Sequence, residues 1–178
     1  SKENDTGRTF LIFDGIYMNS VVYLNGAKIG EWKYGYTRFS LELTGRLREG
    51  ENELMVSVTF QSPNSRWYSG AGINRNVWLM ETKALCIPDG GVYTHAGKAA
   101  DGGWELRVET EMLGPAEEIS AEAELHLYDG DNEVFPSSVE EAEPLAAVQG
   151  HAVCKVLHFA PEAGIRVWDL EDPKLYRL

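Results

Sequence analysis

The sequence predicts an all-β protein built of two sandwich domains. Apolar and polar residues alternate with a period of two in most hydrophobic segments, as expected for strands with one buried face. Turn dipeptides such as Asn25-Gly26 separate these segments. The balance of charged residues changes near residue 85, which indicates two domains rather than one.

In the first half, the predicted strands cover residues 10–13, 21–24, 27–30, 36–43, 53–60 and 76–81. Asn25-Gly26 joins the second and third of these. It is a strong hairpin signal because a type I′ turn needs a positive φ at both central residues. Residues 36–43 and 53–60 alternate cleanly between apolar and polar side chains. No segment of this half requires a helix.

In the second half, strands are predicted at residues 104–112, 119–127, 152–159 and 165–170. Segment 119–127 is rich in Ala, Glu and Leu, which are good helix formers. Its apolar positions follow a period of two, however, so we predict a strand. Several short strands separated by turns within about 90 residues are typical of an immunoglobulin-like sandwich.

The two halves differ in charge and in composition. Residues 1–85 contain ten Lys or Arg and nine Asp or Glu, whereas residues 86–178 contain six and nineteen. Six of the seven prolines fall in the second part. We therefore predict domains at residues 1–85 and 86–178, joined by a short linker that begins at Cys86.

Composition excludes several classes of function. The net charge of −12 opposes binding to nucleic acid or to an anionic membrane. No apolar stretch approaches the roughly 18 residues of a membrane span, and the first residues lack the apolar core of a secretion signal. We therefore expect a cytoplasmic location. The two cysteines are too few for a thiolate zinc site, and we expect no metal and no cofactor.

The motifs of the first half have the order and spacing of a known family. They are Phe13-Asp14-Gly15-Ile16, residues 22–26, residues 35–39, residues 50–54 and the closing run 66–79. This series resembles the N-terminal sugar-binding jelly roll of glycoside hydrolase family 2, and the closing run is most similar to the β-galactosidase branch. Residues 92–178 resemble the immunoglobulin-like sandwich that follows it, mainly through Trp168 and the ending Asp172–Leu178.

The resemblance implies a partial jelly roll followed by an immunoglobulin-like sandwich. In the family, further strands precede the Phe13-Asp14-Gly15 segment and one follows the Leu-Tyr-x-Leu ending. We therefore expect both domains to lack strands here. Open sheet edges invite pairing with another chain, so we expect a homo-oligomer. Asn74 stands where the family usually has an aromatic residue, so no sugar contact is assigned to it.

The resemblance also places catalysis outside this chain. A retaining glycosidase needs two carboxyl groups about 5–5.5 Å apart. In the family both lie on a (β/α)8 barrel, which takes about 250 residues. We therefore predict no catalytic residue here, and expect the intact protein to be a β-galactosidase-like hydrolase whose barrel is this chain's partner.

The resemblance directs attention to the loop 62–75 as the candidate substrate-binding segment. Its candidate residues are Arg66, Trp67, Tyr68 and Arg75. Aromatic faces can pack against the C–H side of a sugar, and a guanidinium donates to hydroxyl groups. The alternative is structural, with the aromatic residues packing against a neighbouring domain and Arg75 tying a loop to backbone carbonyls.

Two other features receive structural interpretations. Asp129–Glu140 has some spacing of a calcium loop, but Val134 replaces the glycine of the tight turn, so a hairpin is predicted. Cys154, between apolar neighbours, is expected to be a buried small side chain rather than a nucleophile.

Three functions remain open from the sequence. The first is that of non-catalytic domains that shape the substrate pocket of a β-galactosidase-like enzyme, with a galactoside as ligand. The second is a free-standing carbohydrate-binding module. The third is an interaction protein whose acidic sandwich docks a basic partner.

Overall fold

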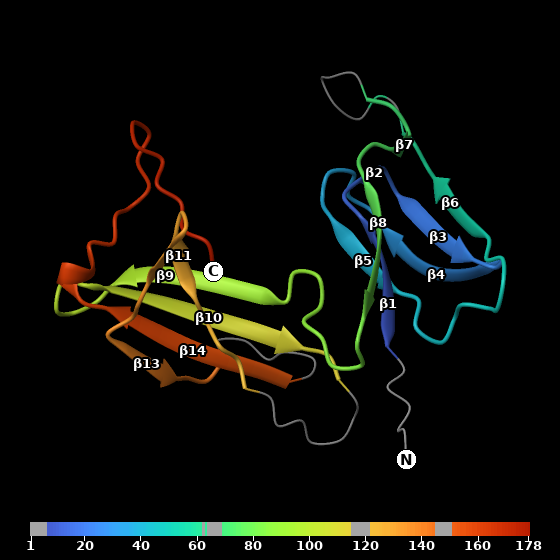
Figure 1. The fold of residues 1–178 in the computed structure, drawn as a ribbon. Helices are drawn as coiled ribbons and strands as arrows, with labels where there is room; N and C mark the ends of the chain where they lie inside the picture. Colours follow the sequence, from blue (N-terminus) through green and yellow to red (C-terminus); the bar gives the residue numbers. More distant parts are fainter. Residues whose placement is uncertain (1–6, 62, 64–68, 115–121, 145–150) are drawn as a thin grey trace, which may run out of the picture. The chain divides into compact units, whose positions relative to one another are not determined.

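The computed structural model describes residues 7–61, 63, 69–114, 122–144 and 151–178 (Figure 1). The chain divides into two compact units, Ser1–Ala84 and Leu85–Leu178. Within the described residues, the regular elements are strands apart from one short 3-10 turn at Pro161–Ala163. The predicted all-β class is therefore confirmed. No helix in the described ranges is long and apolar enough to cross a membrane.

The first unit contains two three-stranded antiparallel sheets. One has the order β5-β1-β8, formed by Phe39–Glu42, Arg8–Phe13 and Val77–Thr82. The other has the order β4-β3-β6, formed by Ala27–Trp32, Ser20–Leu24 and Leu54–Val58. A small third sheet pairs β2 (Ile16–Tyr17) with β7 (Gly72–Ile73). Apart from 36–43, the strands predicted in this half are confirmed with ends shifted by one or two residues.

The β3–β4 hairpin turns at the predicted Asn-Gly pair. Asn25 has a φ of 53° and Gly26 a φ of 81°, as a type I′ turn requires. The Asn25 side chain also accepts a hydrogen bond from the Glu53 amide at 3.0 Å and donates to Asn52 Oδ1 at 2.9 Å. This turn therefore anchors the segment that leads into β6.

The two larger sheets of the first unit share one apolar core. Leu11 and Phe13 of β1 pack with Val22 and Leu24 of β3 and with Phe39 of β5. The Phe13 ring is fully buried and stacks on that of Phe39 with 5.2 Å between centroids. Because both sheets contribute to this cluster, they pack face to face as a sandwich, as expected for a jelly roll.

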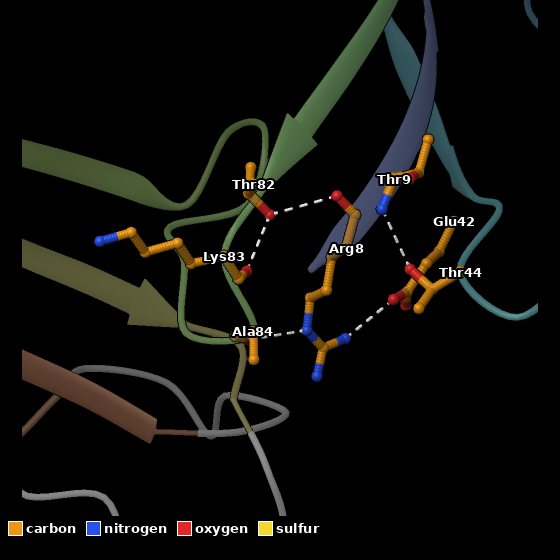
Figure 2. Close-up of polar contacts among 7 residues, drawn as sticks. All are labelled: Arg8, Thr9, Glu42, Thr44, Thr82, Lys83 and Ala84. Carbon is orange, nitrogen blue, oxygen red and sulfur yellow. Dashed lines mark hydrogen bonds and ion pairs between the residues drawn. The ribbon is translucent and has the colours of Figure 1, made fainter. Parts of the chain in front are cut away.

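The start of β1 is held by polar contacts to both flanking strands, as Figure 2 shows. The Arg8 guanidinium donates to Glu42 Oε1 at 2.9 Å and to the Ala84 carbonyl at 3.0 Å. The Thr9 amide donates to Thr44 Oγ1 at 3.1 Å. Arg8 thus links the segment after β8 to the sheet in which β1 is the central strand.

The second unit has a four-stranded antiparallel sheet in the order β13-β14-β10-β9. Its strands are Ser138–Glu141, His151–Phe159, Trp104–Met112 and Val92–Lys98. Leu127 of the hairpin β11–β12 (Leu127–Asp129 and Asn132–Val134) packs with Val108, Leu157 and Phe159 in one buried cluster. This hairpin therefore forms the second layer, packed on the four-stranded sheet. The predicted strands 104–112 and 152–159 are confirmed. The hairpin predicted in place of a calcium loop is also confirmed.

The strand predicted over residues 119–127 is wrong for its described part. Residues 119–121 lie outside the described ranges, residues 122–126 belong to no strand, and β11 begins only at Leu127. The Ala123 carbonyl accepts from Lys155 Nζ at 2.7 Å, and Leu125 packs on the core of the second unit. The alternation that predicted a strand reflects side-chain packing onto a sheet rather than backbone pairing.

Of two other predicted strands, one is wrong and one is only partly confirmed. Residues 165–170 form no strand, because only Ile165 packs on the core while Val167, Trp168 and Leu170 are exposed. Of the strand predicted at 36–43, only Phe39–Glu42 (β5) is regular. In both segments apolar residues alternate over a short stretch, but a strand also needs a neighbouring strand to pair with, which the pattern does not indicate.

The core of the first unit depends on Phe13. We predict that Phe13→Ala lowers the free energy of unfolding of this unit by about 3–5 kcal/mol, since it leaves a cavity where no water replaces the ring. Phe135→Ala, at an exposed phenylalanine of the second unit, should change stability by less than about 0.5 kcal/mol. Urea denaturation of both variants measures the difference, and equal effects would contradict the assignment of the core.

A surface histidine of the second unit gives a pH-dependent contribution to stability. His126 Nδ1 lies 2.6 Å from Glu133 Oε1, and Nε2 lies 3.2 Å from Glu124 Oε1. The hydrogen bond to Glu133, followed by the charges of both glutamates, raises the pKa of His126 above its ordinary 6.5. A raised pKa means that this stabilisation is present below about pH 6.5 and is lost as the pH rises through the folded-state value.

We predict that Glu133→Gln lowers the pKa of His126 and that Glu124→Gln lowers it less. The reason is that Glu133 makes the shorter contact and is the less exposed of the two. NMR titration of the His126 ring protons measures both shifts. The reverse ranking, or no change with Glu133→Gln, would refute this assignment.

Candidate functional site

Of the four candidate substrate-binding residues, the described structure includes Arg75. Arg66, Trp67 and Tyr68 lie outside the described residues. Arg75 is exposed, and its Nη1 donates to the backbone carbonyl of Tyr36 at 3.1 Å. Arg75 therefore ties the loop after β7 to the loop between β4 and β5.

Backbone contacts bring the end of the candidate loop against β2. The Asn74 amide donates to the Gly15 carbonyl at 3.2 Å, and the Asp14 amide donates to the Asn76 carbonyl at 3.0 Å. Together with the β2–β7 pairing, these bonds lay residues 72–76 beside residues 14–17. The sequence motifs around Gly15 and around Arg75 thus meet at one place in the first unit.

An aromatic cluster that the sequence pattern does not predict lies at this place. Tyr17 is buried, with 8% of its surface exposed, and its ring lies 5.2 Å from that of Tyr36 and 6.2 Å from that of Phe60. Tyr34 packs edge-on against Tyr36 with 5.9 Å between centroids. The sequence predicts that Tyr36 begins the strand 36–43, whereas Tyr36 lies in the loop before β5.

Gly35 is essential to the packing of this cluster. A Cβ atom at residue 35 would lie 2.2 Å from Cδ2 of the Tyr17 ring, which is far inside van der Waals contact. The loop can therefore lie on Tyr17 only with glycine at this position. A single glycine allows the tyrosines on either side of it to project from the same tight loop.

A neighbouring polar group is fully engaged within the protein. Asp14 Oδ1 accepts from Arg38 Nη1 at 2.7 Å, and Asp14 Oδ2 accepts from Trp78 Nε1 at 2.8 Å. Through its two oxygens, Asp14 links Arg38, which precedes β5, to Trp78 of β8. We assign it no role in proton transfer.

The second unit holds one chain of contacts that superficially suggests nucleophilic chemistry. His158 Nδ1 lies 2.8 Å from Ser137 Oγ, and His158 Nε2 lies 3.1 Å from Asp101 Oδ2. A serine hydrolase uses the two ring nitrogens in the opposite sense. The Ser137 hydroxyl also lies 2.9 Å from the His158 carbonyl, to which it donates. These contacts join the turn before β10 to the edge of the sheet.

Cys154 is buried, as predicted, and burial raises the pKa of its thiol. A raised pKa keeps the sulfur protonated and poorly nucleophilic. Within the described parts of the chain, no three His, Cys, Asp or Glu side chains are grouped so that they could hold a metal ion. The arrangement at the end of the first unit therefore offers aromatic faces and a guanidinium, which are groups for binding.

The family of the first unit is shown by its sequence. Residues 1–84 match the family model described as the glycosyl hydrolase 2 galactose-binding domain-like family. Residues 1–84 therefore form a galactose-binding-like domain of glycosyl hydrolase family 2. The aromatic cluster and Arg75 both lie within this galactose-binding-like domain.

The whole chain is similar to parts of larger glycosidases. It is 34% identical to the beta-galactosidase BoGH2A of Bacteroides ovatus, over 98% of this chain and 20% of that protein. It is 28% identical to a putative beta-glucuronidase of Formosa agariphila, over 99% of this chain and 16% of that protein. The chain thus spans about a fifth or less of the length of these curated relatives.

The fold is shared with a solved structure of the same family. A glycosyl hydrolase family 2 member from Bacteroides cellulosilyticus superposes with a TM-score of 0.68 at 24% sequence identity. The match covers 96% of this chain and 23% of that one. The strands of each unit therefore follow those of that glycosidase, and the chain matches the N-terminal part of family 2 glycosidases.

The close approach of Gly35 to Tyr17 can be tested directly. We predict that Gly35→Ala displaces the Tyr17 ring and lowers the free energy of unfolding of the galactose-binding-like domain by about 1–3 kcal/mol. Gly70→Ala is the matched control, because a Cβ atom there meets nothing within 4 Å. Thermal unfolding of the two variants gives the comparison, and an unchanged midpoint for Gly35→Ala would contradict the packing described.

Proposed function

We propose that this chain supplies the non-catalytic N-terminal domains of a β-galactosidase-like hydrolase and that its loop 62–75 shapes the substrate pocket. The observation that carries the proposal is the galactose-binding-like domain at residues 1–84, together with the similarity of nearly the whole chain to a much longer beta-galactosidase. The bond from Arg75 to Tyr36 supports it, because it holds one end of this loop in a defined place.

The chemistry of the described residues supports a binding role. Hydrolysis by retention needs two carboxyl groups about 5–5.5 Å apart, one of them with a raised pKa. Asp14, three residues before Tyr17 of the aromatic cluster, has both oxygens occupied by Arg38 and Trp78. The proposal therefore assigns the acid and the nucleophile to another part of the intact protein.

Kinetics of the intact protein test the role of the loop. We expect Trp67→Ala to raise KM for a nitrophenyl β-galactoside roughly tenfold while kcat changes little, since it removes binding common to the ground and transition states. Trp168→Ala, at an exposed tryptophan of the second unit, is the matched control and should leave KM unchanged.

Two outcomes would refute the proposal. One is an unchanged KM for Trp67→Ala with a lowered melting temperature, which would make Trp67 a packing residue. The other is turnover of the nitrophenyl galactoside by the 178-residue chain alone, which would place catalytic groups within it.

A further inference from the structure

We propose that Tyr34 and Tyr36 form a second carbohydrate contact of the galactose-binding-like domain, on which a galactopyranoside ring stacks while Arg75 donates to its hydroxyl groups. This inference rests on the proposed function and deepens it. It assigns a ligand contact to the loop between β4 and β5, outside the loop 62–75 that the sequence indicated.

Tyr34 and Tyr36 expose aromatic rings that neighbouring rings hold in place. Tyr36 is 48% exposed and Tyr34 is 61% exposed. Tyr36 rests on the buried Tyr17 ring, and Tyr34 packs edge-on against Tyr36. A ring held from below by another ring keeps its remaining face available and loses little freedom when a ligand stacks on it.

The loop itself is also held at both ends. Gly35 is buried against Tyr17, and the Tyr36 carbonyl accepts from Arg75. On the side of β4, Trp32 Nε1 donates to Thr37 Oγ1 at 2.9 Å, and the Trp32 ring stacks on the core residue Phe39 at 5.1 Å. The two tyrosines are thus presented on a short, cross-braced loop, which is the preorganisation that a binding surface needs.

Polar groups without a protein partner in the described part of the chain accompany the two rings. One nitrogen of the Arg75 guanidinium is used for the bond to Tyr36, and within the described residues its other N–H donors have no protein acceptor. The hydroxyls of Tyr34 and Tyr36 likewise have no hydrogen bond among the described residues. Aromatic faces bordered by unused donors and acceptors match a ligand that has an apolar face and a rim of hydroxyl groups.

Galactose has this shape. Its axial 4-hydroxyl leaves the hydrogens of C3, C4 and C5 on one continuous apolar face, and the equatorial hydroxyls point outward from the ring. The stacked ring would cover a tyrosine face, and its hydroxyls would then meet the Arg75 guanidinium. A glucoside has an equatorial 4-hydroxyl and therefore lacks the continuous apolar face formed by the hydrogens of C3, C4 and C5. It serves as the comparison ligand.

The test is an NMR titration of the 178-residue chain with methyl β-D-galactoside, observing the aromatic signals of selectively labelled tyrosine. We expect saturable shifts of Tyr34 and Tyr36 with a dissociation constant on the order of 10 mM. Tyr34→Ala should weaken binding at least about fivefold, and Tyr34→Phe, which keeps the ring, should weaken it less than about threefold. Tyr93→Ala, at an exposed tyrosine of β9, should leave binding unchanged.

Three results of this titration would overturn the inference. They are the absence of saturable shifts up to about 100 mM sugar, undiminished binding by Tyr34→Ala, and equal binding of methyl β-D-glucoside.

The Tyr34→Ala and Tyr93→Ala variants can also be compared in the intact protein, where Tyr34→Ala should raise KM at least about fivefold and Tyr93→Ala should not. There, a raised KM for Trp67→Ala with a normal KM for Tyr34→Ala would remove this inference alone, whereas normal KM values for both would remove the proposed function as well.

Discussion

Burial of β1 on both of its faces is the constraint on which the galactose-binding-like domain depends. Phe10, Leu11, Ile12 and Phe13 are all buried, although only alternate residues of a strand can face the sandwich core. A strand in this position must be central, and β1 pairs with β5 on one side and with β8 on the other. Edge strand β8 is less covered: Leu79 lies opposite Leu11 on the core-facing side and remains 62% exposed.

The candidate site follows from the end of this strand. Asp14 leaves β1 and fixes Arg38 and Trp78, while Gly15 meets Asn74 and Tyr17 receives the loop of Gly35. The core therefore determines where β1 ends, and that endpoint gathers three loops that are distant in the sequence. The groups collected there are aromatic rings and hydrogen-bond donors. The acidic second unit contributes surface ion pairs, such as those of His126, that stabilise its own sandwich.

The strands could be predicted where the sequence contains a local signal. Asn25-Gly26 determines its hairpin through backbone conformation alone. The alternation of residues 104–112 predicts a strand correctly because its apolar side chains pack in the core of the second unit. Alternation was misleading at residues 122–126, where Leu125 packs on the core but the Ala123 carbonyl bonds to the Lys155 side chain. A period of two indicates which side chains are buried. It does not indicate whether another strand lies within hydrogen-bonding distance, because that depends on residues distant in the sequence.

The sequence by itself determined the all-β class, the strands with strong turn signals and the motifs that resemble family 2 glycosidases. Through that resemblance it also indicated the loop 62–75, in which Arg75 is one of four candidate residues. Only the tertiary structure decided that Arg75 bonds to the Tyr36 carbonyl and that Tyr17, Tyr34 and Tyr36 form one cluster. Those residues come from separate loops, and their approach depends on the sandwich core and on the absence of a side chain at Gly35, which no local pattern encodes.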